Sequence, residues 1–249
     1  MKVIENTEEL EIRSPYDYDA AACAKRALAS RASLAAVLDH TLLKPDATRN
    51  AIIALCHEAG EHRFACAMVN PAWVPLASSV LEGSGVPVGT VIGFPLGANL
   101  SISKRDEARE MVKLGARDLD MVLNIGMLKS GMNAQVEADI HCVVEVARDA
   151  GARVKVILET CLLSLEEKLR ASELAIAAGT DFLKTSTGFS ASGATPDDVA
   201  LLRGVAGNRC GVKASGGIRT LADARMMLEA GASRIGSSAS VRILEALPV

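Results

Sequence analysis

Three lysines lie at positions where a lysine is costly. Lys155, Lys184 and Lys213 each interrupt a short apolar run, and they recur at a constant interval of 29 residues. Such runs are typical of buried parallel strands, in which an unpaired ammonium is strongly destabilising. One such lysine could form a structural ion pair, whereas three at the same phase of a repeat indicate a cluster of amines facing one interior. Positively charged neighbours lower a lysine's pKa and make it a nucleophile that forms Schiff bases, so the sequence predicts an enzyme.

Lys184 is the strongest candidate for the nucleophile. It is followed by the small polar turn Thr185–Gly188, which leaves room for a ligand. The alternative is a lysine near a strand end that reaches solvent or pairs with an acid. We expect the functional role because the other two lysines share the repeat.

Two acids accompany the lysines. Asp120 interrupts the apolar run 118–123, and Glu159 follows the run 156–158. Asp120 could be a counter-ion for a lysine, a proton shuttle held by the lysines, or both. Glu159 could belong to the same network, and the residues leave open whether its role is structural or functional.

Glycine- and serine-rich turns follow the last predicted strands. Glycines let a phosphate approach backbone N–H groups, and serines add hydroxyl donors. In barrel enzymes the loops after strands 7 and 8 often form such a site. A single Gly-Gly pair is only a turn, but two such loops together with Gly188 predict a phosphate-binding site made by Gly188, Gly216, Gly217, Gly236, Ser237 and Ser238.

Short apolar strands alternate with amphipathic helices from about residue 34 onward. Several helices end in Ala-Gly, and glycine there suits the left-handed conformation that closes a helix. The eight expected strands are Ala36–Leu38, Phe64–Val69, Val86–Ile92, Asp118–Leu123, Val154–Leu158, Phe182–Thr185, Gly211–Ala214 and Arg234–Gly236. The expected helices are Arg49–Ala59, Ala72–Leu81, Lys104–Leu114, Ala134–Ala150, Leu165–Ala178, Pro196–Arg203 and Leu221–Ala230.

Eight βα units in succession, with no break in composition, predict an α/β fold of the (β/α)8 TIM barrel type. We expect a single barrel domain over residues 34–249. Residues 1–33 would form a short N-terminal extension, with a helix over Tyr18–Ser30 packed against the barrel; the alternative is a loose tail. The carboxyl ends of barrel strands carry the active site, so the lysines and acids are expected there.

Composition narrows the possible functions. A net charge of −3 and a pI near 5.9 argue against nucleic-acid binding or membrane-surface binding by bulk electrostatics. The N-terminus lacks the apolar core of a signal peptide, and no run approaches the roughly 18 apolar residues of a membrane span. The six cysteines are scattered without a C-x-x-C pair. This usage is typical of reduced proteins, and we expect a cytoplasmic protein.

A metal site is not expected from the histidines. His57, His62 and His141 fall in or beside predicted helices, and together with His40 they show no shared placement at strand ends. A metal-dependent aldol mechanism needs several converging histidine or acid ligands. We therefore expect chemistry without a metal.

The residues taken together resemble the deoxyribose-phosphate aldolase family over roughly 38–241. The matching stretches are LDHTLLKPDAT from Leu38, GTVIGFPLGA from Gly89, VKVILET from Val154, DFLKTSTGF from Asp181, GVKASGGIRT from Gly211 and RIGSSAS from Arg234. The combination of the block around Lys184 with the block around Lys213 is highly specific.

This resemblance implies a role for each residue. Lys184 would form the Schiff base with the substrate aldehyde, and Lys213 would lie beside it, lower its pKa and help in proton transfer. Our own hypothesis is that Lys213, as a like charge on the adjoining strand, is the main cause of this low pKa. Asp120 would donate and accept protons, through a bound water, and the six glycines and serines would hold the phosphate. The implied reaction is reversible cleavage of 2-deoxy-D-ribose 5-phosphate to D-glyceraldehyde 3-phosphate and acetaldehyde. The resemblance implies no cofactor.

Three alternatives stay open. A flavin or isomerase barrel could have the phosphate loops, but it would not need paired lysines. Another Schiff-base aldolase could use the same barrel on a ketose phosphate or a 2-keto acid. A barrel that binds phosphate without catalysis could have a regulatory role, although the combined presence of Lys184, Lys213 and Asp120 argues against it. The expected partner is a small phosphorylated sugar, and a homodimer is expected by analogy with other barrels.

Overall fold

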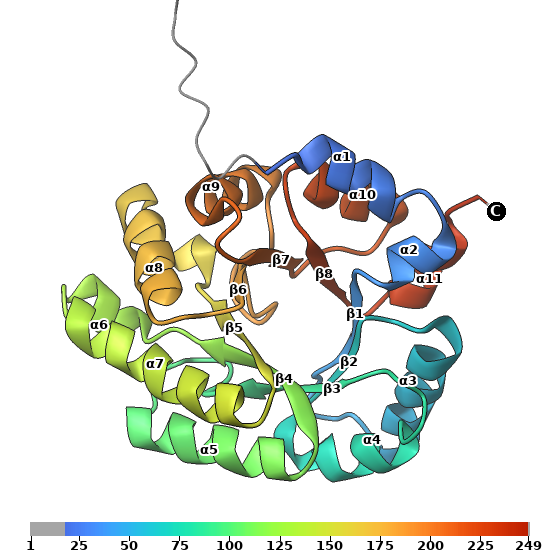
Figure 1. Cartoon of the computed structure of the whole chain (residues 1–249), viewed down its shortest axis with the longest axis horizontal. Coiled ribbons are helices and arrows are strands. Elements are labelled where there is room, and N and C mark those ends of the chain that lie inside the picture. Colours follow the sequence, from blue (N-terminus) through green and yellow to red (C-terminus); the bar gives the residue numbers. More distant parts are fainter. Residues whose placement is uncertain (1–17, 249) are drawn as a thin grey trace, which may run out of the picture.

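Eight parallel strands close into a barrel in sequence order, with helices around the outside (Figure 1). The computed structural model describes residues 18–248. The strands are β1 Leu38–Leu42, β2 Cys66–Val69, β3 Val88–Ile92, β4 Ala116–Val122, β5 Arg153–Ile157, β6 Phe182–Lys184, β7 Gly211–Ser215 and β8 Arg234–Ser237. The expected (β/α)8 barrel is therefore confirmed.

The outer ring consists of the helices that follow each strand. They are α3 Arg49–His62, η1 Pro71–Trp73, α4 Val74–Val80, α5 Ser101–Lys113, α6 Ile125–Lys129, α7 Asn133–Asp149, η2 Thr160–Leu162, α8 Leu165–Ala177, α9 Pro196–Ala206, α10 Leu221–Glu229 and α11 Ser240–Glu245. Each of the seven helices expected between strands has a counterpart within a few residues. The short helices α6 and α11 were not expected.

Side-chain alternation along the strands separates the two faces of the barrel wall. On β5, Val154 and Val156 contribute to the apolar core between strands and helices. Lys155 lies between them in the chain and points to the opposite face, because successive side chains of a strand alternate. The apolar run 154–158 therefore places its single charged side chain, Lys155, in the barrel interior.

The interior of the barrel has an apolar part and a charged part. A small cluster of Leu43, Cys66, Met68 and Val91 fills the side formed by β2 and β3. The other strands contribute buried charged side chains, which are Asp39, Asp118, Asp120, Lys155, Lys184, Lys213 and Arg234. This division places the ionisable groups together on one side.

Two short helices precede the first strand instead of one. The expected helix Tyr18–Ser30 is wrong in its limits, because α1 spans Ala20–Ala27 and α2 spans Arg31–Ala35. The chain breaks at Ser30, whose side chain accepts a hydrogen bond from the backbone of Ser33 and so begins α2. A serine favours this role at a helix start over a place inside a helix. The expected domain boundary between residues 33 and 34 falls inside α2 and stays a prediction.

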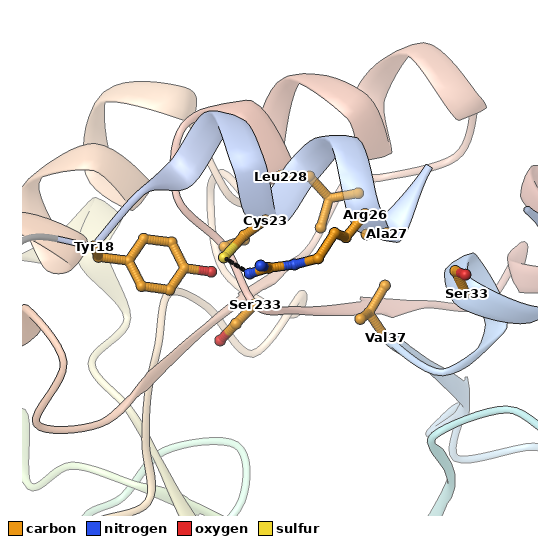
Figure 2. A pocket seen from close by; sticks show the side chains of 9 residues that line it. Tyr18, Cys23, Arg26, Ala27, Ser33, Val37, Leu228 and Ser233 are labelled. Carbon is orange, nitrogen blue, oxygen red and sulfur yellow. Dashed lines mark hydrogen bonds between the residues drawn. The ribbon is translucent and has the colours of Figure 1, made fainter. Parts of the chain in front are cut away.

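Helix α1 packs against α10 on the outside of the barrel (Figure 1). Tyr18 lies over the guanidinium of Arg203, 3.8 Å from ring centroid to Cζ. Figure 2 shows a side cavity of about 330 Å³ beneath α1, where Arg26 donates to the Sγ of Cys23 at 2.8 Å. The stacking of Tyr18 on Arg203 and the packing of α1 on α10 fasten the N-terminal segment to α9 and α10. All six cysteines of the chain are free.

Two other expected limits are corrected by the structure. The first strand begins at Leu38, where it was expected to end, and continues to Leu42. Helix α3 runs past Gly60 to His62 and is closed by Arg63, whose φ of 53° is left-handed. The Ala-Gly rule therefore fails at Gly60, because a glycine inside a helix costs only about 1 kcal/mol relative to alanine and does not by itself end the helix.

Candidate active site

Lys184 and Lys213 are register partners on the neighbouring strands β6 and β7. Lys184 is the last residue of β6 and Lys213 is the middle residue of β7, and both line the cavity formed by the loops that follow these strands. Barrel active sites form at this end. The side chains are almost completely buried, with 3% of Lys184 and 1% of Lys213 exposed. The repeat in the sequence thus brings two amines to the same level of the barrel.

Lys155 lies one layer deeper than the other two lysines. Its partner on β6 is Phe182, while the partner of Lys184 on β5 is Ile157. Two residues of a parallel strand span about 7 Å, so the strand stagger of the barrel separates residues that share a repeat phase. The three amines face one interior as expected, since all of them contact Asp120, but they lie at two levels of the barrel.

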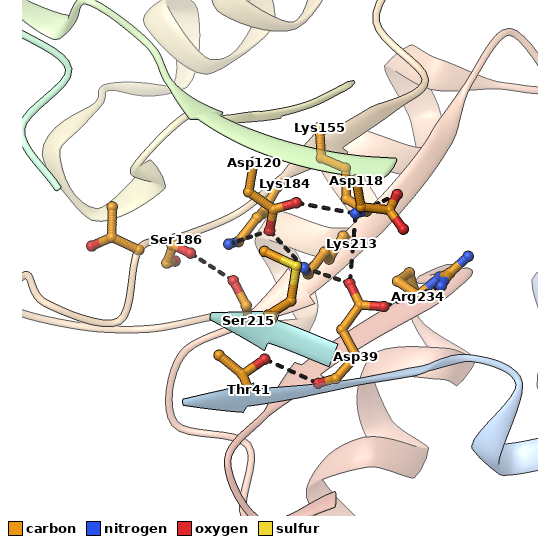
Figure 3. A network of polar contacts seen from close by, with 12 residues as sticks. Asp39, Thr41, Asp118, Asp120, Lys155, Lys184, Ser186, Lys213, Ser215 and Arg234 are labelled. Atoms are coloured by element: carbon orange, nitrogen blue, oxygen red, sulfur yellow. Dashed lines mark hydrogen bonds and ion pairs between the residues drawn. The ribbon is translucent and has the colours of Figure 1, made fainter. Parts of the chain in front are cut away.

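Asp120 is the common partner of the three lysines (Figure 3). Its Oδ2 accepts from Lys184 Nζ at 2.7 Å and from Lys213 Nζ at 2.6 Å, and its Oδ1 accepts from Lys155 Nζ at 3.1 Å. The carboxylate is fully buried. The structure brings Asp120, Lys184 and Lys213 together as the sequence predicted, and their catalytic roles stay predictions.

A second set of ion pairs involves the lysines that contact Asp120. Asp39 lies 2.6 Å from Lys213 Nζ and 3.1 Å from an Nη of Arg234, while Asp118 lies 2.8 Å from Lys155 Nζ. Figure 3 shows these groups converging from β1, β4, β5, β7 and β8. Sequence reasoning missed Asp39 and Arg234. The signal was present, since Asp39 alternates with Leu38 on β1, but the strand was expected to end at Leu38.

Cations outnumber carboxylates in this network. The described interior groups are Lys155, Lys184, Lys213 and Arg234 against Asp39, Asp118 and Asp120, and Arg153 adds a further cation on Asp118 at 2.8 Å. Such an excess favours the loss of a proton from one amine. Arginines keep their proton, so a lysine must be the group that loses it.

The pKa values identify Lys184 as that lysine. Burial is the main cause that lowers the pKa of Lys184 from 10.5 to about 8; Asp120 opposes this shift and the charge of Lys213 adds to it. The expectation that Lys213 is the main cause is therefore wrong. Burial acts in the same direction on Lys155, but its three neighbouring carboxylates outweigh burial and raise the pKa of Lys155 above its ordinary value.

The carboxylates remain ionised. Burial alone would raise the pKa of Asp120, yet Lys155, Lys184 and Lys213 together hold this pKa well below its ordinary value. Burial also raises the pKa of Asp39, but the positive charges of Lys213, Lys155 and Arg234 outweigh burial and lower this pKa to about 2. At neutral pH both aspartates are therefore available to accept protons or hydrogen bonds.

A cavity of about 370 Å³ opens above the amines. All six residues expected to bind phosphate line it, as do the reactive candidates; the members are Lys184, Lys213, Asp120, Gly188, Gly216, Gly217, Gly236, Ser237 and Ser238. Two cations that sequence reasoning did not select, Lys44 and Arg219, line the same cavity. The loops after β6, β7 and β8 thus share one opening with the lysines.

The two serines of the last loop differ in what they can offer a ligand. Ser237 Oγ donates to the carbonyl of Ile218 at 2.7 Å and accepts from the backbone of Ala239 at 2.9 Å. Its hydroxyl proton is already used, so the expected hydroxyl donor to phosphate is not available from Ser237. Ser238 is exposed in the cavity, and within residues 18–248 its hydroxyl has no hydrogen-bond partner.

The residues that the structure describes contain no group of three histidine, cysteine, aspartate or glutamate side chains arranged to hold a metal. His40 is buried on β1 and its Nε2 lies 2.6 Å from Glu58.

Within the described part of the chain, no helix is both long and apolar enough to cross a membrane.

A barrel with a low-pKa lysine beside a second lysine and an aspartate has the site of a Schiff-base aldolase, a lyase. Residues 33–243 match the family described as DeoC/LacD family aldolase, and the chain belongs to this family. Two relatives named deoxyribose-phosphate aldolase are similar. The one from Geobacillus sp. is 53% identical over 86% of this chain and 95% of the relative. The one from Listeria welshimeri is 54% identical over 85% and 95%.

The fold also agrees with a solved structure. The deoxyribose phosphate aldolase from Aeropyrum pernix, described as a unique tetramer, is 36% identical to this chain, with a TM-score of 0.85. The similarity covers 92% of this chain and 96% of that one.

Proposed function

We propose that this chain cleaves 2-deoxy-D-ribose 5-phosphate reversibly to D-glyceraldehyde 3-phosphate and acetaldehyde. The names of the relatives from Geobacillus and Listeria support this substrate. The single observation that carries the proposal is one cavity lined both by Lys184, whose pKa is lowered to about 8, and by the glycine-serine loops after β7 and β8. An amine nucleophile and glycine-serine loops that line one cavity suit an aldehyde that carries a phosphate.

The reaction begins at Lys184. The neutral amine attacks C1 of the open-chain sugar, and loss of water gives a protonated iminium. A fall in pKa from about 10.4 to about 8 raises the fraction of free amine at neutral pH by a few hundredfold. The nucleophile is therefore available without an external base.

Cleavage needs a proton acceptor at the C3 hydroxyl. Asp120 is ionised and held 2.7 Å from Lys184 Nζ, so it is placed to accept this proton directly or through a water. The electrons of the C2–C3 bond move into the iminium, which leaves an enamine on Lys184 and releases D-glyceraldehyde 3-phosphate. The enamine takes a proton at C2 from the same network, and water then releases acetaldehyde.

Phosphate binding holds the far end of the sugar. Backbone N–H groups of the loops after β6, β7 and β8, the hydroxyl of Ser238, and the side chains of Lys44 and Arg219 are the available donors at the cavity. Binding energy from this end orients the C2–C3 bond at Lys184. The expected homodimer stays a prediction, and the Aeropyrum relative is described as tetrameric.

Reductive trapping tests the proposal. Incubation with acetaldehyde and sodium borohydride should convert one lysine to its N-ethyl derivative, and peptide mass spectrometry should place the label on Lys184. A label on Lys155 would overturn the assignment of the nucleophile. Release of pyruvate or dihydroxyacetone phosphate from other substrates, in place of acetaldehyde, would favour the alternative aldolases, and absence of any adduct would favour a binding protein.

A further inference from the structure

Glu159 lies outside the cavity, but it fixes a loop that forms the cavity wall. We propose that Glu159 is a positioning residue, which holds Thr187 and Gly188 at the phosphate end of the site. This inference rests on the proposed function, because it assigns how that same site selects a phosphorylated substrate. The sequence left the role of Glu159 open.

The backbone of Glu159 is held in an unusual conformation. It has φ 57° and ψ 61°, the left-handed region, directly after strand β5, and its side chain is only 3% exposed. A residue other than glycine pays about 1–2 kcal/mol for this conformation. Strain of this kind persists where surrounding contacts impose it, and it is concentrated at functional sites.

The carboxylate of Glu159 makes most of its contacts with Thr187; the Sγ of Cys161 lies 4.0 Å from its Oε1. Its two oxygens accept the backbone N–H of Thr187 at 3.3 and 3.4 Å, and Oε2 also accepts the hydroxyl of Thr187 in a short contact. Because the hydroxyl of Thr187 donates its proton to Glu159, its oxygen is left to accept. That hydroxyl oxygen then accepts the backbone N–H of Phe189 at 3.0 Å. The turn Thr187–Phe189 is thereby closed around Gly188.

The same loop is fixed to the loop after β7 at its other end. The backbone N–H of Ala194 donates to the carbonyls of Ser215 and Gly216, each at 3.1 Å. Gly193 approaches the backbone of Gly216 so closely that a Cβ at Gly193 would collide with it. The segment 187–194 is therefore held at both ends, by Glu159 and by the loop of Gly216.

Gly188 lies between these two anchors and faces the phosphate loops. Its φ is 85°, and a Cβ at this position would lie 3.8 Å from Cα of Gly216. In the part of the chain that the structure describes, the backbone N–H groups of Gly188 and Gly217 have no hydrogen-bond partner. Backbone donors of this kind bind anions when they are held in place. Loss of the Glu159 anchor should therefore weaken binding of the phosphate and leave the lysine chemistry intact.

Two variants separate these effects. Glu159→Gly removes the carboxylate and suits the left-handed backbone, so the fold is retained. Glu159→Gln keeps one acceptor oxygen for the hydroxyl of Thr187. We expect KM for 2-deoxyribose 5-phosphate to rise roughly tenfold to a hundredfold in Glu159→Gly, the usual effect of losing hydrogen bonds to a charged group. The KM of Glu159→Gln should lie between that of Glu159→Gly and that of the wild type. In both variants kcat should change little.

Hydrogen–deuterium exchange at C2 of acetaldehyde is the control, because it needs Lys184 and no phosphate. This exchange should proceed at the wild-type rate in both variants. The midpoint of unfolding of Glu159→Gln should equal that of the wild type within experimental error. An unchanged KM, or a parallel loss of exchange and of sugar cleavage, would overturn the positioning role. A wild-type protein that neither exchanges nor forms an adduct would refute the proposed function itself, which keeps the two failures distinct.

Discussion

Lys184 and Lys213 face each other across β6 and β7, and their Nζ atoms contact the same oxygen of Asp120 at 2.7 and 2.6 Å. Two amines on one carboxylate oxygen cannot both remain protonated without repulsion. A proton can therefore pass among Lys184, Lys213 and Asp120 over short distances. This arrangement links the nucleophile to its proton acceptor without any further residue.

Replacement of Lys213 tests its share in this arrangement. Wild-type activity should rise with pH to a plateau above about 8, since burial and Lys213 lower the pKa of Lys184 to about 8 and only the neutral amine reacts. Lys213→Leu removes the like charge, so the pKa of Lys184 should rise. The rising part of the curve of activity against pH should then move to higher pH. We expect turnover to fall by roughly 10²–10⁴, the usual share of a proton-transfer group.

The control for Lys213 is Lys213→Arg, which keeps a positive charge next to Lys184. The rising part of its curve of activity against pH should stay close to that of the wild type, even if its turnover is lower. A Lys213→Leu profile with the same midpoint as the wild type would exclude an electrostatic effect of Lys213 on Lys184.

Asp120→Asn should impair proton transfer more than it impairs adduct formation. The amide keeps the shape but cannot accept a proton at neutral pH, so C2 exchange of acetaldehyde should slow by about 10²–10⁴. Nuclear magnetic resonance in deuterated water measures this rate. Asp118→Asn is the matched control, since Asp118 pairs with Lys155 and Arg153 and should leave most of the exchange intact. Exchange near the wild-type rate in Asp120→Asn would exclude it as the proton carrier.

Asp39→Asn should reduce stability in a pH-dependent way. The folded pKa of Asp39 is about 2, below the ordinary 3.8, so its contribution is complete above about pH 4 and is lost as the pH falls through about 2. Removing one partner of a buried ion pair costs about 3 kcal/mol or more. The difference in unfolding free energy between variant and wild type, from urea titrations, should be large at pH 7 and shrink towards pH 2.

The control for Asp39 is a surface carboxylate. Asp106 pairs with Arg105 and Arg109 on α5 and about half of its side chain is exposed. Asp106→Asn should change the free energy of unfolding by less than about 1 kcal/mol. Equal effects of Asp39→Asn and Asp106→Asn would contradict the buried network as a source of stability.

Ser237 and Ser238 should behave differently when each is changed to alanine. Ser238→Ala should raise KM for the phosphorylated sugar by roughly fivefold to tenfold, the effect of one hydrogen bond, without a change in unfolding. Ser237→Ala loses bonds to Ile218 and Ala239 and should lower the unfolding midpoint. Steady-state kinetics and thermal unfolding check both. An unaltered KM in Ser238→Ala would remove this hydroxyl from the phosphate site.

The barrel could be predicted because its signals are local and repeated. Thr195 accepts from the backbone of Asp198 and begins α9 with Pro196, as its sequence indicates. The first strand was placed too early because Ala36–Leu38 is uniformly apolar, whereas β1 alternates and carries Asp39 into the interior. Buried polar residues are hidden from a search for apolar runs, and Asp39 was missed for this reason.

The amino-acid sequence by itself determined the barrel, the residue types of the site and Lys184 as the candidate nucleophile. Only the tertiary structure decided the level at which Lys184 and Lys213 meet and the cause of the low pKa of Lys184. Lys155 lies deeper, among the carboxylates of Asp39, Asp118 and Asp120, while Lys184 has one carboxylate and opens to the cavity. A pKa depends on burial and on distances through space, and the stagger of the strands sets both, so no spacing along the chain could rank the three lysines.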